Sequence, residues 1–209
     1  MKKFLLVDDH EIVRNGLKMV LKEFYPSCIT DEANDEAQAM NFLKQQDYDL
    51  AILDIHLPGS DSIRLTEFIG RRNNRTRVLI YSMGQESIYA RRLIKAGASG
   101  YVSKNSKLGD LRQAIETVLN GRTYLSQEVI EQLANDLGQP QKENPFESLS
   151  SREFEVATLL MAERSITTIS EILGIGVSTT ATHKARLFEK LRIKSVAELI
   201  KLAELYGKK

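Results

Sequence analysis

Short apolar runs that end in a polar or charged residue recur through the first half of this 209-residue chain. Residues 50–53 form one such run, which is too short for a helix and is followed by Asp54 and, further on, a Pro-Gly turn. An uninterrupted apolar run of this length is typical of a parallel strand covered on both faces. The pattern therefore restricts the first half of the chain to folds that contain a buried parallel sheet.

Three more apolar runs that end at a polar or charged residue occur in this half of the chain. The further runs are residues 3–7, ending at Asp8 and Asp9, residues 77–81, ending at Ser82, and residues 100–103, ending at Lys104. Between the runs, apolar residues recur at helical spacing. The segments with this spacing are residues 11–25, 35–46, 63–71, 86–96 and 107–120. Strands that alternate with helices predict an α/β fold with a doubly wound parallel sheet and right-handed crossovers.

Because ligands bind at the carboxyl ends of the strands in such sheets, the polar residues at these ends are expected to converge. They are Asp8, Asp9, Asp54, Ser82 and Lys104. Crowded carboxylates repel one another unless a cation neutralises them, and Mg²⁺ suits a site of carboxylates, water and phosphate. A carboxylate beside Mg²⁺ can attack a phosphoryl group and form an acyl phosphate. Taken alone, Asp54 is equally well interpreted as a turn cap.

With these residues in this order and spacing, the first part of the chain resembles the receiver domain of two-component response regulators, a flavodoxin-like fold. The resemblance implies that Asp54 is the phosphoacceptor, and that Asp8 and Asp9 form the acidic pair that binds Mg²⁺ with it. It also implies that Ser82 and Lys104 contact the phosphoryl oxygens. The chemistry expected is limited to phosphorylation and dephosphorylation of Asp54, so the chain is not predicted to be an enzyme.

Two further positions take their roles from the same resemblance. Tyr101 corresponds to the aromatic switch residue, which is expected to follow Ser82 when the acceptor is phosphorylated. His56, two residues after the acceptor, is expected to give its main-chain carbonyl to Mg²⁺. Its side chain is then free to influence hydrolysis of the phosphoryl group.

Composition limits the partners and the compartment. The 29 basic and 28 acidic residues give a formal net charge of +1, so a nucleic-acid-binding surface has to be local. No stretch is apolar enough to span a bilayer or to form a signal peptide, so we expect a cytoplasmic protein without a membrane partner. The single cysteine, Cys28, excludes an internal disulfide and is expected to be a small buried residue on the second strand.

The composition changes after the last helical pattern of the sheet domain. Residues 126–137 have an amphipathic pattern that predicts a short helix, and residues 138–145 hold two prolines without apolar periodicity, as hinges do. We therefore divide the chain into a receiver domain at residues 1–122, a linker with a short helix at residues 123–145, and a second domain at residues 146–209.

The second domain is patterned as short helices and is too short for another sheet. The predicted helices are residues 152–161, 168–173, 178–191 and 196–206. Capping-box spacing at Ser150 and Ser195 marks two of the starts, and Thr168 is a third candidate. A glycine-bearing turn at residues 174–176 joins a short helix to a longer one, which is a helix-turn-helix arrangement.

The longer helix of this pair concentrates positive charge. Leu187 and Leu191 are expected to face the core, with Thr180 on the same side. The residues expected to contact DNA are Ser178, Thr179, Thr182, His183, Lys184, Arg186 and Lys190. An isolated basic run is more often a solvated face, but the turn and the helix lengths favour a recognition helix.

The second part of the chain is similar to the NarL/LuxR-type helix-turn-helix. The residues that carry the similarity are Leu149, Ser150, Arg152, Glu153, Ile169, Ser170, Leu173, Thr179, His183, Leu187, Lys190, Leu191 and residues 196–200. Three positions depart from the family pattern: Glu163 replaces a glycine, Thr180 a valine and Ala181 a lysine. The departures are expected to affect base preference and affinity more than the fold. The resemblance also suggests that residues 196–206 help dimerisation, although a role in the domain core is equally compatible.

The two resemblances together predict a DNA-binding transcriptional regulator that a sensor histidine kinase phosphorylates on Asp54. We expect a homodimer on activation that binds double-stranded DNA at half-sites about one helical turn apart. Two alternatives come from other functional classes. One is a regulator that binds DNA without phosphorylation and uses its receiver as a protein interaction module. The other is a phosphoester hydrolase with Asp54 as nucleophile.

Overall fold

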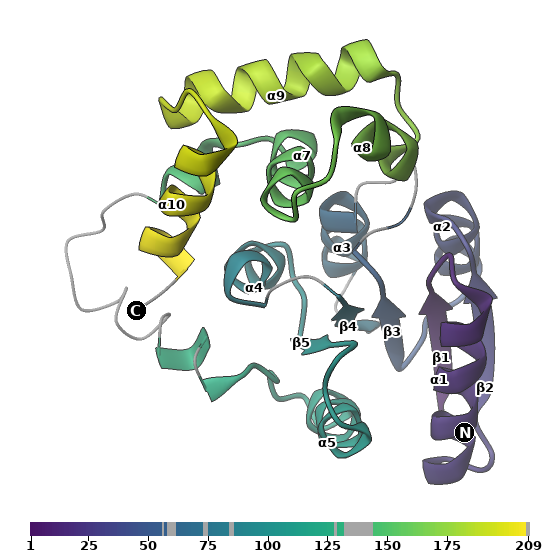
Figure 1. Cartoon of the computed structure of the whole chain (residues 1–209). Helices are drawn as coiled ribbons and strands as arrows, with labels where there is room; N and C mark the ends of the chain where they lie inside the picture. Colours follow the sequence, from purple (N-terminus) through teal and green to yellow (C-terminus); the bar gives the residue numbers. More distant parts are fainter. Residues whose placement is uncertain are drawn as a thin grey trace. The chain divides into compact units, whose positions relative to one another are not determined.

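A computed structural model shows two compact units, residues 1–127 and residues 128–209 (Figure 1). The structure describes residues 1–55, 57, 62–72, 75–83, 86–127, 129–131 and 144–207. Each unit buries its own set of apolar side chains. None of the described helices combines the length and the apolarity needed to cross a membrane.

The first unit is built on a parallel sheet of five strands in the order β2-β1-β3-β4-β5. The strands are β1 (Lys3–Val7), β2 (Ile29–Ala33), β3 (Leu50–Leu53), β4 (Arg77–Ser82) and β5 (Gly100–Ser103). β2 lies on one side of β1 and the later strands lie on the other, so the topological switch point is between β1 and β3. Ligands bind at this point in doubly wound folds. The predicted fold class is confirmed.

Five helices cover the two faces of this sheet (Figure 1). They are α1 (Glu11–Phe24), α2 (Glu36–Gln45), α3 (Ser62–Arg71), α4 (Glu86–Lys95) and α5 (Leu108–Leu119). On one face, Phe4 and Leu6 pack with residues of α1 and α5 in one apolar cluster. Side chains alternate along a strand, so Leu5 and Val7 point to the opposite face, and both are buried there. The predicted ends of these helices agree with the observed ones to within one residue.

The edge of the sheet at β5 is covered by residues that follow α5. Tyr124 pairs with Gly100 as an isolated parallel bridge, and the Tyr124 carbonyl accepts a hydrogen bond of 3.0 Å from the Tyr101 amide. A Cβ at Gly100 would lie 2.8 Å from the Tyr124 carbonyl oxygen, so only glycine permits this approach. The first unit therefore extends to residue 127, whereas the sequence interpretation began the linker at residue 123.

Most of the predicted linker lies outside the described residues. Gln127 and residues 129–131 are helical, in agreement with the start of the helix predicted at residues 126–137, and residues 132–143 are not described. Cys28 is half-buried and lies one residue before β2, rather than buried on that strand as predicted.

The second unit is all-helical in its described part. Its elements are a 3₁₀ turn η1 (Pro145–Ser148) and the helices α7 (Ser151–Met161), α8 (Ile166–Leu173), α9 (Val177–Leu191) and α10 (Val196–Gly207). Ser150 caps α7 in a complete capping box with Glu153, as its spacing predicts. The cap of α8 is Ser165, which accepts a hydrogen bond from the Thr168 amide. The capping box proposed at Thr168 is therefore wrong, and α8 begins two residues earlier than predicted.

The turn between α8 and α9 has the conformation that its glycines allow. Gly174 ends α8 with a φ of 61°, in the left-handed region that favours glycine. The Ile175 amide donates a hydrogen bond of 3.1 Å to the Ser170 carbonyl and closes the end of the helix. Gly176 then caps α9. The predicted helix-turn-helix is present as α8 and α9.

Glu163, which replaces a glycine of the family pattern, lies between α7 and α8 with a φ of 58°. A residue with a Cβ is strained in this conformation by roughly 1 to 2 kcal/mol. We expect Glu163→Gly to raise the free energy of unfolding of the second unit by about 1 kcal/mol. The gain is smaller than the full strain because glycine also has greater conformational freedom in the unfolded chain. Differential scanning calorimetry of the full chain measures this change.

The matched control for this variant is Gly174→Ala. The φ of Gly174 is 61°, nearly the same as that of Glu163. Because this residue is already a glycine, its replacement by alanine introduces the strain that Glu163→Gly removes. We expect Gly174→Ala to lower the stability of the second unit by about 1 kcal/mol. Shifts of the same sign in both variants would contradict the explanation by backbone strain.

Candidate functional site

The predicted acidic cluster is assembled by the pairing of β1 with β3. Val7 and Leu53 are opposite each other in the parallel register, so Asp8 and Asp54 follow at neighbouring strand ends. The Asp54 amide donates a hydrogen bond of 2.8 Å to the Val7 carbonyl and continues the pairing by one step. Asp8 and Asp54 are 2% and 4% exposed, so two carboxylates are buried side by side.

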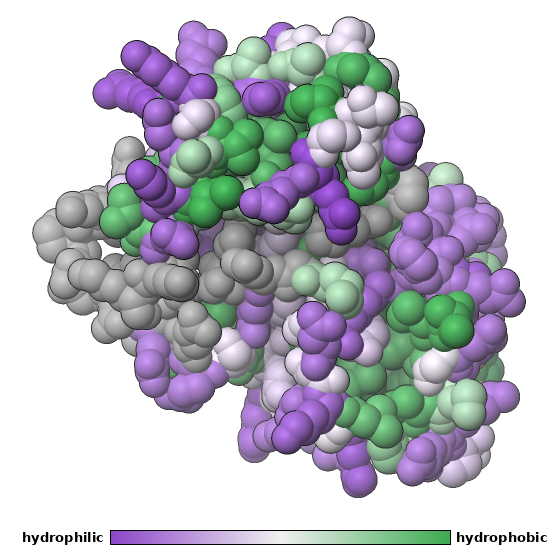
Figure 2. All heavy atoms as spheres, viewed as in Figure 1, coloured by the Kyte–Doolittle hydropathy of each residue, from purple (hydrophilic) through white to green (hydrophobic). Residues whose placement is uncertain are grey.

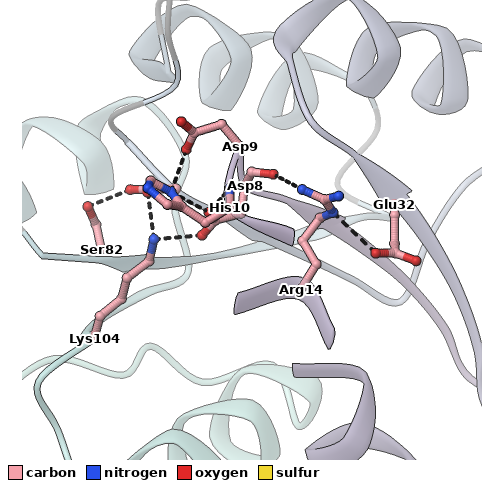
Figure 3. A network of polar contacts seen from close by, with 8 residues as sticks. Asp8, Asp9, His10, Arg14, Glu32, Ser82 and Lys104 are labelled. Atoms are coloured by element: carbon pink, nitrogen blue, oxygen red, sulfur yellow. Dashed lines mark hydrogen bonds and ion pairs between the residues drawn. The ribbon is translucent and has the colours of Figure 1, made fainter. Parts of the chain in front are cut away.

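Ser82 and Lys104 meet Asp54 from the next two strands. The Ser82 hydroxyl donates a hydrogen bond of 2.6 Å to Asp54 Oδ1. The Lys104 ammonium lies 2.6 Å from Asp54 Oδ2. It also lies 2.6 Å from Asp8 Oδ2 (Figure 3). Lys104 therefore bridges the two buried carboxylates, while Ser82 contacts the other oxygen of Asp54. The structure brings these four predicted residues together.

The charge state of Lys104 is set by these neighbours. Burial alone lowers the pKa of an ammonium group, and the Lys104 side chain is only 10% exposed. The charges of Asp54 and Asp8 and their hydrogen bonds outweigh burial, so the pKa of Lys104 is raised above its ordinary value. Lys104 is therefore a cation at neutral pH, held beside the Asp54 carboxylate.

Asp9 lies at the opening of the cluster, with its side chain 28% exposed. Its Oδ1 atom is buried and lies 2.8 Å from the His10 Nδ1 atom. The ligand atoms of Asp8, Asp9, His10 and Asp54 all lie within 4.8 Å of one another. Three carboxylates gathered in this way fit a hard divalent cation such as Mg²⁺.

His10 belongs to this cluster, although the sequence analysis gave it no role. Its amide donates a hydrogen bond of 2.9 Å to Asp8 Oδ1. Its Nδ1 atom lies 2.8 Å from Asp9 Oδ1 and 3.3 Å from Asp8 Oδ1. The position directly after the acidic pair was the only signal available in the sequence. His56, predicted to offer its carbonyl to the metal, lies outside the described residues.

Tyr101 is buried within β5, with 1% of its surface exposed. Burial raises the pKa of its hydroxyl far above the ordinary value, and the nearby Tyr89, Glu86 and Asp54 raise it further. The sequence analysis expects Tyr101 to follow Ser82 when Asp54 is phosphorylated. In the structure Ser82 and Lys104 already contact the Asp54 carboxylate, and Tyr101 is already buried.

In the second unit, the predicted recognition helix α9 exposes one polar face. Ser178, Thr179, Thr182 and Arg186 are exposed, as predicted for residues that contact DNA. Lys184 is half-buried, with its ammonium 5.4 Å from the centre of the Phe188 ring. Figure 2 shows hydrophilic side chains gathered over the end of α9 that joins α10.

The other two residues predicted to contact DNA, Lys190 and His183, have surroundings that differ from the exposed polar face of α9. The Lys190 ammonium lies 2.6 Å from Glu153 Oε2 and 3.2 Å from the Ser148 carbonyl oxygen. His183 is half-buried, and its Nδ1 atom is buried without a hydrogen bond among the described residues. Burial lowers the pKa of His183, and Arg186 and Arg152 lower it further against the opposing effect of Glu153.

Thr180, which replaces a valine of the family pattern, is fully buried beside Leu187 and Leu191 on the core side of α9. A buried hydroxyl without a partner is costly. The Thr180 hydroxyl donates a hydrogen bond of 3.2 Å to the Gly176 carbonyl, one turn earlier, so this cost is avoided. The departure therefore leaves the fold intact, as expected.

Comparison with known families agrees with both halves of this geometry. Residues 4–116 match the response regulator receiver domain, and residues 147–203 match the bacterial regulatory proteins of the luxR family. The chain belongs to the response-regulator family. It is a DNA-binding transcription regulator of the NarL/LuxR type within two-component systems.

Similar proteins extend over nearly the whole chain. Response regulator GacA of Pseudomonas syringae pv. syringae is 33% identical over 208 residues, which are 99% of this chain and 97% of that protein. Response regulator UvrY of Escherichia coli K12 is 30% identical over 204 residues, 97% of this chain and 94% of that protein. RcsB of Salmonella enterica serovar Typhimurium, solved on promoter rprA with phosphomimetic BeF₃⁻, has a TM-score of 0.63 at 21% identity, covering 96% of this chain and 97% of that chain.

The ion pair between Lys190 and Glu153 generates a prediction about stability. Glu153 is 4% exposed, so removal of the ammonium leaves a buried carboxylate held by the Ser150 amide. We expect Lys190→Met to lower the free energy of unfolding of the second unit by about 2 kcal/mol. Calorimetry of the full chain at pH 7 measures the loss, and Lys201→Met, at an exposed position on α10, is the control.

The same pair predicts how stability depends on pH. Burial raises the pKa of Glu153, but the hydrogen bonds from Lys190 and Ser150 and the Lys190 charge lower it below the ordinary value of 4.5. Its contribution to stability is therefore complete above pH 4.5 and is lost as the pH falls through the folded-state pKa. In Lys190→Met the folded-state pKa of Glu153 rises toward or above its ordinary value, so the acid-induced loss of stability becomes smaller than in the wild type. Identical pH profiles of wild type and variant would contradict this role of Lys190.

Proposed function

We propose that the chain accepts a phosphoryl group on Asp54 from the phosphohistidine of a sensor kinase, or from a small phosphodonor, and thereby changes its DNA binding. One observation carries the proposal. The Asp54 carboxylate lies buried between a hydroxyl and an ammonium, both at 2.6 Å, with a further acidic pair at the neighbouring strand end. This is the set of groups that phosphoryl transfer to a carboxylate requires.

The transfer itself follows from the geometry of the acceptor. An oxygen of Asp54 attacks phosphorus, a new P–O bond forms, and the bond from phosphorus to the donor nitrogen or oxygen breaks. The carboxylates of Asp8, Asp9 and Asp54 would hold Mg²⁺, which supplies positive charge to the phosphoryl oxygens. Lys104 supplies a second positive charge at a fixed position. The Ser82 hydroxyl is placed to donate a hydrogen bond to the product.

Phosphorylation requires Lys104 and Ser82 to change partners. Each now contacts one oxygen of the Asp54 carboxylate, and the acyl phosphate presents new oxygens that carry roughly −1.5 to −2 charges. We propose that Lys104 and Ser82 transfer their bonds to these oxygens. The change at the site is therefore an exchange of hydrogen-bond partners by residues that are already in place.

The segment that leads out of the receiver is connected to the region of Tyr101. The Tyr124 carbonyl accepts from the Tyr101 amide, and the Ser126 amide donates a hydrogen bond of 2.8 Å to Glu86 Oε1 in the first turn of α4. We propose that a rearrangement at β5 and α4 reaches the linker by these bonds. The rearrangement would then favour a homodimer that binds double-stranded DNA.

In the DNA-binding unit, α9 is proposed to lie in the major groove, with the exposed residues Thr179, Thr182 and Arg186 near the DNA. The ion pair of Lys190 with Glu153 fixes the C-terminal half of α9 against α7. We therefore propose that Lys190 orients the helix. If the Lys190 ammonium also contacts a DNA phosphate, it does so while paired with Glu153. A cytoplasmic location is proposed with this function.

A phosphorylation experiment tests the role of Asp54. With Mg²⁺ and acetyl phosphate, we expect the intact mass of the wild type to increase by one phosphoryl group, and light scattering to show a dimer. Asp54→Asn removes the nucleophilic oxygen and should show neither change. If the variant binds DNA and dimerises as the wild type does, the receiver is a phosphorylation-independent interaction module, and the proposed switch is rejected.

A salt titration tests the proposed DNA-binding face. Arg186→Ala removes an exposed cation from α9, and we expect it to weaken binding of the acetyl-phosphate-treated full chain to a duplex of about 30 base pairs. If Arg186 contacts a phosphate, the slope of log K against log salt concentration should decrease by about one. Lys201→Ala, which removes an exposed cation from α10, should leave the slope unchanged. Equal slopes for wild type and Arg186→Ala would place the interface elsewhere.

A further inference from the structure

Arg14 lies in the first turns of α1 and is only 13% exposed, although it takes no part in the predicted phosphoacceptor site. Its Nη1 atom donates a hydrogen bond of 2.6 Å to the main-chain carbonyl of Asp8. Its Nε atom donates a hydrogen bond of 3.1 Å to Glu32 Oε2 (Figure 3). The guanidinium group thus connects the backbone of the acidic pair to a carboxylate on another element.

Glu32 lies on β2 at the edge of the sheet. In the parallel register it is opposite Leu6, whose side chain packs with residues of α1, so Glu32 faces the same helix. Lys18, one turn after Arg14, lies 2.6 Å from Glu32 Oε1. The hydrogen bond from Lys18 makes the largest contribution to lowering the pKa of Glu32, and Arg14 lowers it further against the effect of burial. Glu32 is therefore ionised at neutral pH and fixes the orientation of the Arg14 guanidinium.

Asp8 is held at both of its main-chain polar groups. Its amide donates a hydrogen bond of 3.1 Å to the Ala33 carbonyl, and its carbonyl accepts from Arg14. The peptide unit between Asp8 and Asp9 contains that carbonyl, so Arg14 acts on the backbone that carries both carboxylates. A fixed backbone presents the two carboxylates to a cation without a further loss of conformational freedom.

We propose that Arg14, oriented by Glu32, is a positioning residue for the divalent cation at the acidic pair. The inference rests on the proposed function, in which Asp8, Asp9 and Asp54 hold Mg²⁺. Arg14 acts through the Asp8 main chain, since it bonds the carbonyl rather than a carboxylate oxygen. Removal of a single group that orients a metal ligand typically lowers metal affinity roughly 10- to 100-fold. We expect the loss of Arg14 to fall in this range.

The chain contains a matched control for a purely structural role. Lys18 and Arg14 both come from α1 and both bind the Glu32 carboxylate. Among the described contacts, only Arg14 of these two bonds Asp8. Lys18→Met therefore disturbs the connection between α1 and β2 without removing a bond to the acidic pair, whereas Arg14→Met removes both.

The test is a titration of the full chain with MgCl₂ at fixed ionic strength, followed by the NMR shifts of the Asp9 and His10 amides. We expect Arg14→Met to raise the Kd for Mg²⁺ about tenfold. Lys18→Met should change it by less than about twofold, although both variants lower the melting temperature. Equal Kd values in Arg14→Met and Lys18→Met would overturn the proposal.

A second readout separates positioning from general damage to the fold. At saturating Mg²⁺, the initial rate of Asp54 phosphorylation by acetyl phosphate should return close to the wild-type rate in Arg14→Met. A rate that stays low at every Mg²⁺ concentration would overturn the proposal. If Arg14→Met does not fold, Glu32→Gln replaces it, because this variant keeps the Arg14 bond to Asp8 but weakens its orientation. A Kd in Glu32→Gln equal to that of the wild type would also overturn the proposal.

The outcomes distinguish the inference from the proposed function on which it rests. If the wild type shows no Mg²⁺-dependent shift at Asp9 and His10, the acidic pair does not bind the cation and both proposals fail. If the wild type binds Mg²⁺ and is phosphorylated, but Arg14→Met binds Mg²⁺ equally well, only the role of Arg14 is rejected.

Discussion

Two carboxylates buried at neighbouring strand ends are the central constraint on this structure. Burial removes the hydration of Asp8 and Asp54. Without a cation between them, the two carboxylates would also repel each other. The Lys104 ammonium meets both at 2.6 Å, and it can do so because β5 follows β4 in the sheet order and ends at the same edge. The arrangement of five strands and the chemistry proposed for Asp54 therefore depend on the same electrostatic balance.

The second unit also buries a carboxylate that is neutralised by a lysine. Glu153 caps the start of α7 by accepting from the Ser150 amide, and the Lys190 ammonium neutralises it from α9. One ion pair thus connects the capping box to the proposed recognition helix. Part of the positive charge of α9 serves the fold of the domain, and the exposed part is available to nucleic acid.

The repeated patterns of apolar residues predicted most elements of both units, because period and length reflect local backbone geometry. The run at β2, Ile29–Ala33, is largely polar and was not among the apolar runs. The polar residues at strand ends also predicted which side chains would meet at the site. Contacts formed by partners distant in sequence were missed. Tyr124 was placed in the linker although it pairs with the edge strand, and local spacing does not contain the information for that pairing. The cap of α8, a local contact, was assigned to Thr168 instead of Ser165 because both residues carry a hydroxyl that can cap a helix.

The sequence by itself determined the α/β receiver, the helix-turn-helix and the acidic pocket at the strand ends, since these follow from short-range periodicity and from the parallel sheet that it requires. The tertiary structure alone decided which basic residues are engaged internally. Lys190 and Arg14 look like ordinary surface cations in the sequence, yet one neutralises Glu153 and the other bonds the Asp8 carbonyl. The partner of a long, flexible charged side chain depends on which elements pack against it, and that is a property of the folded chain.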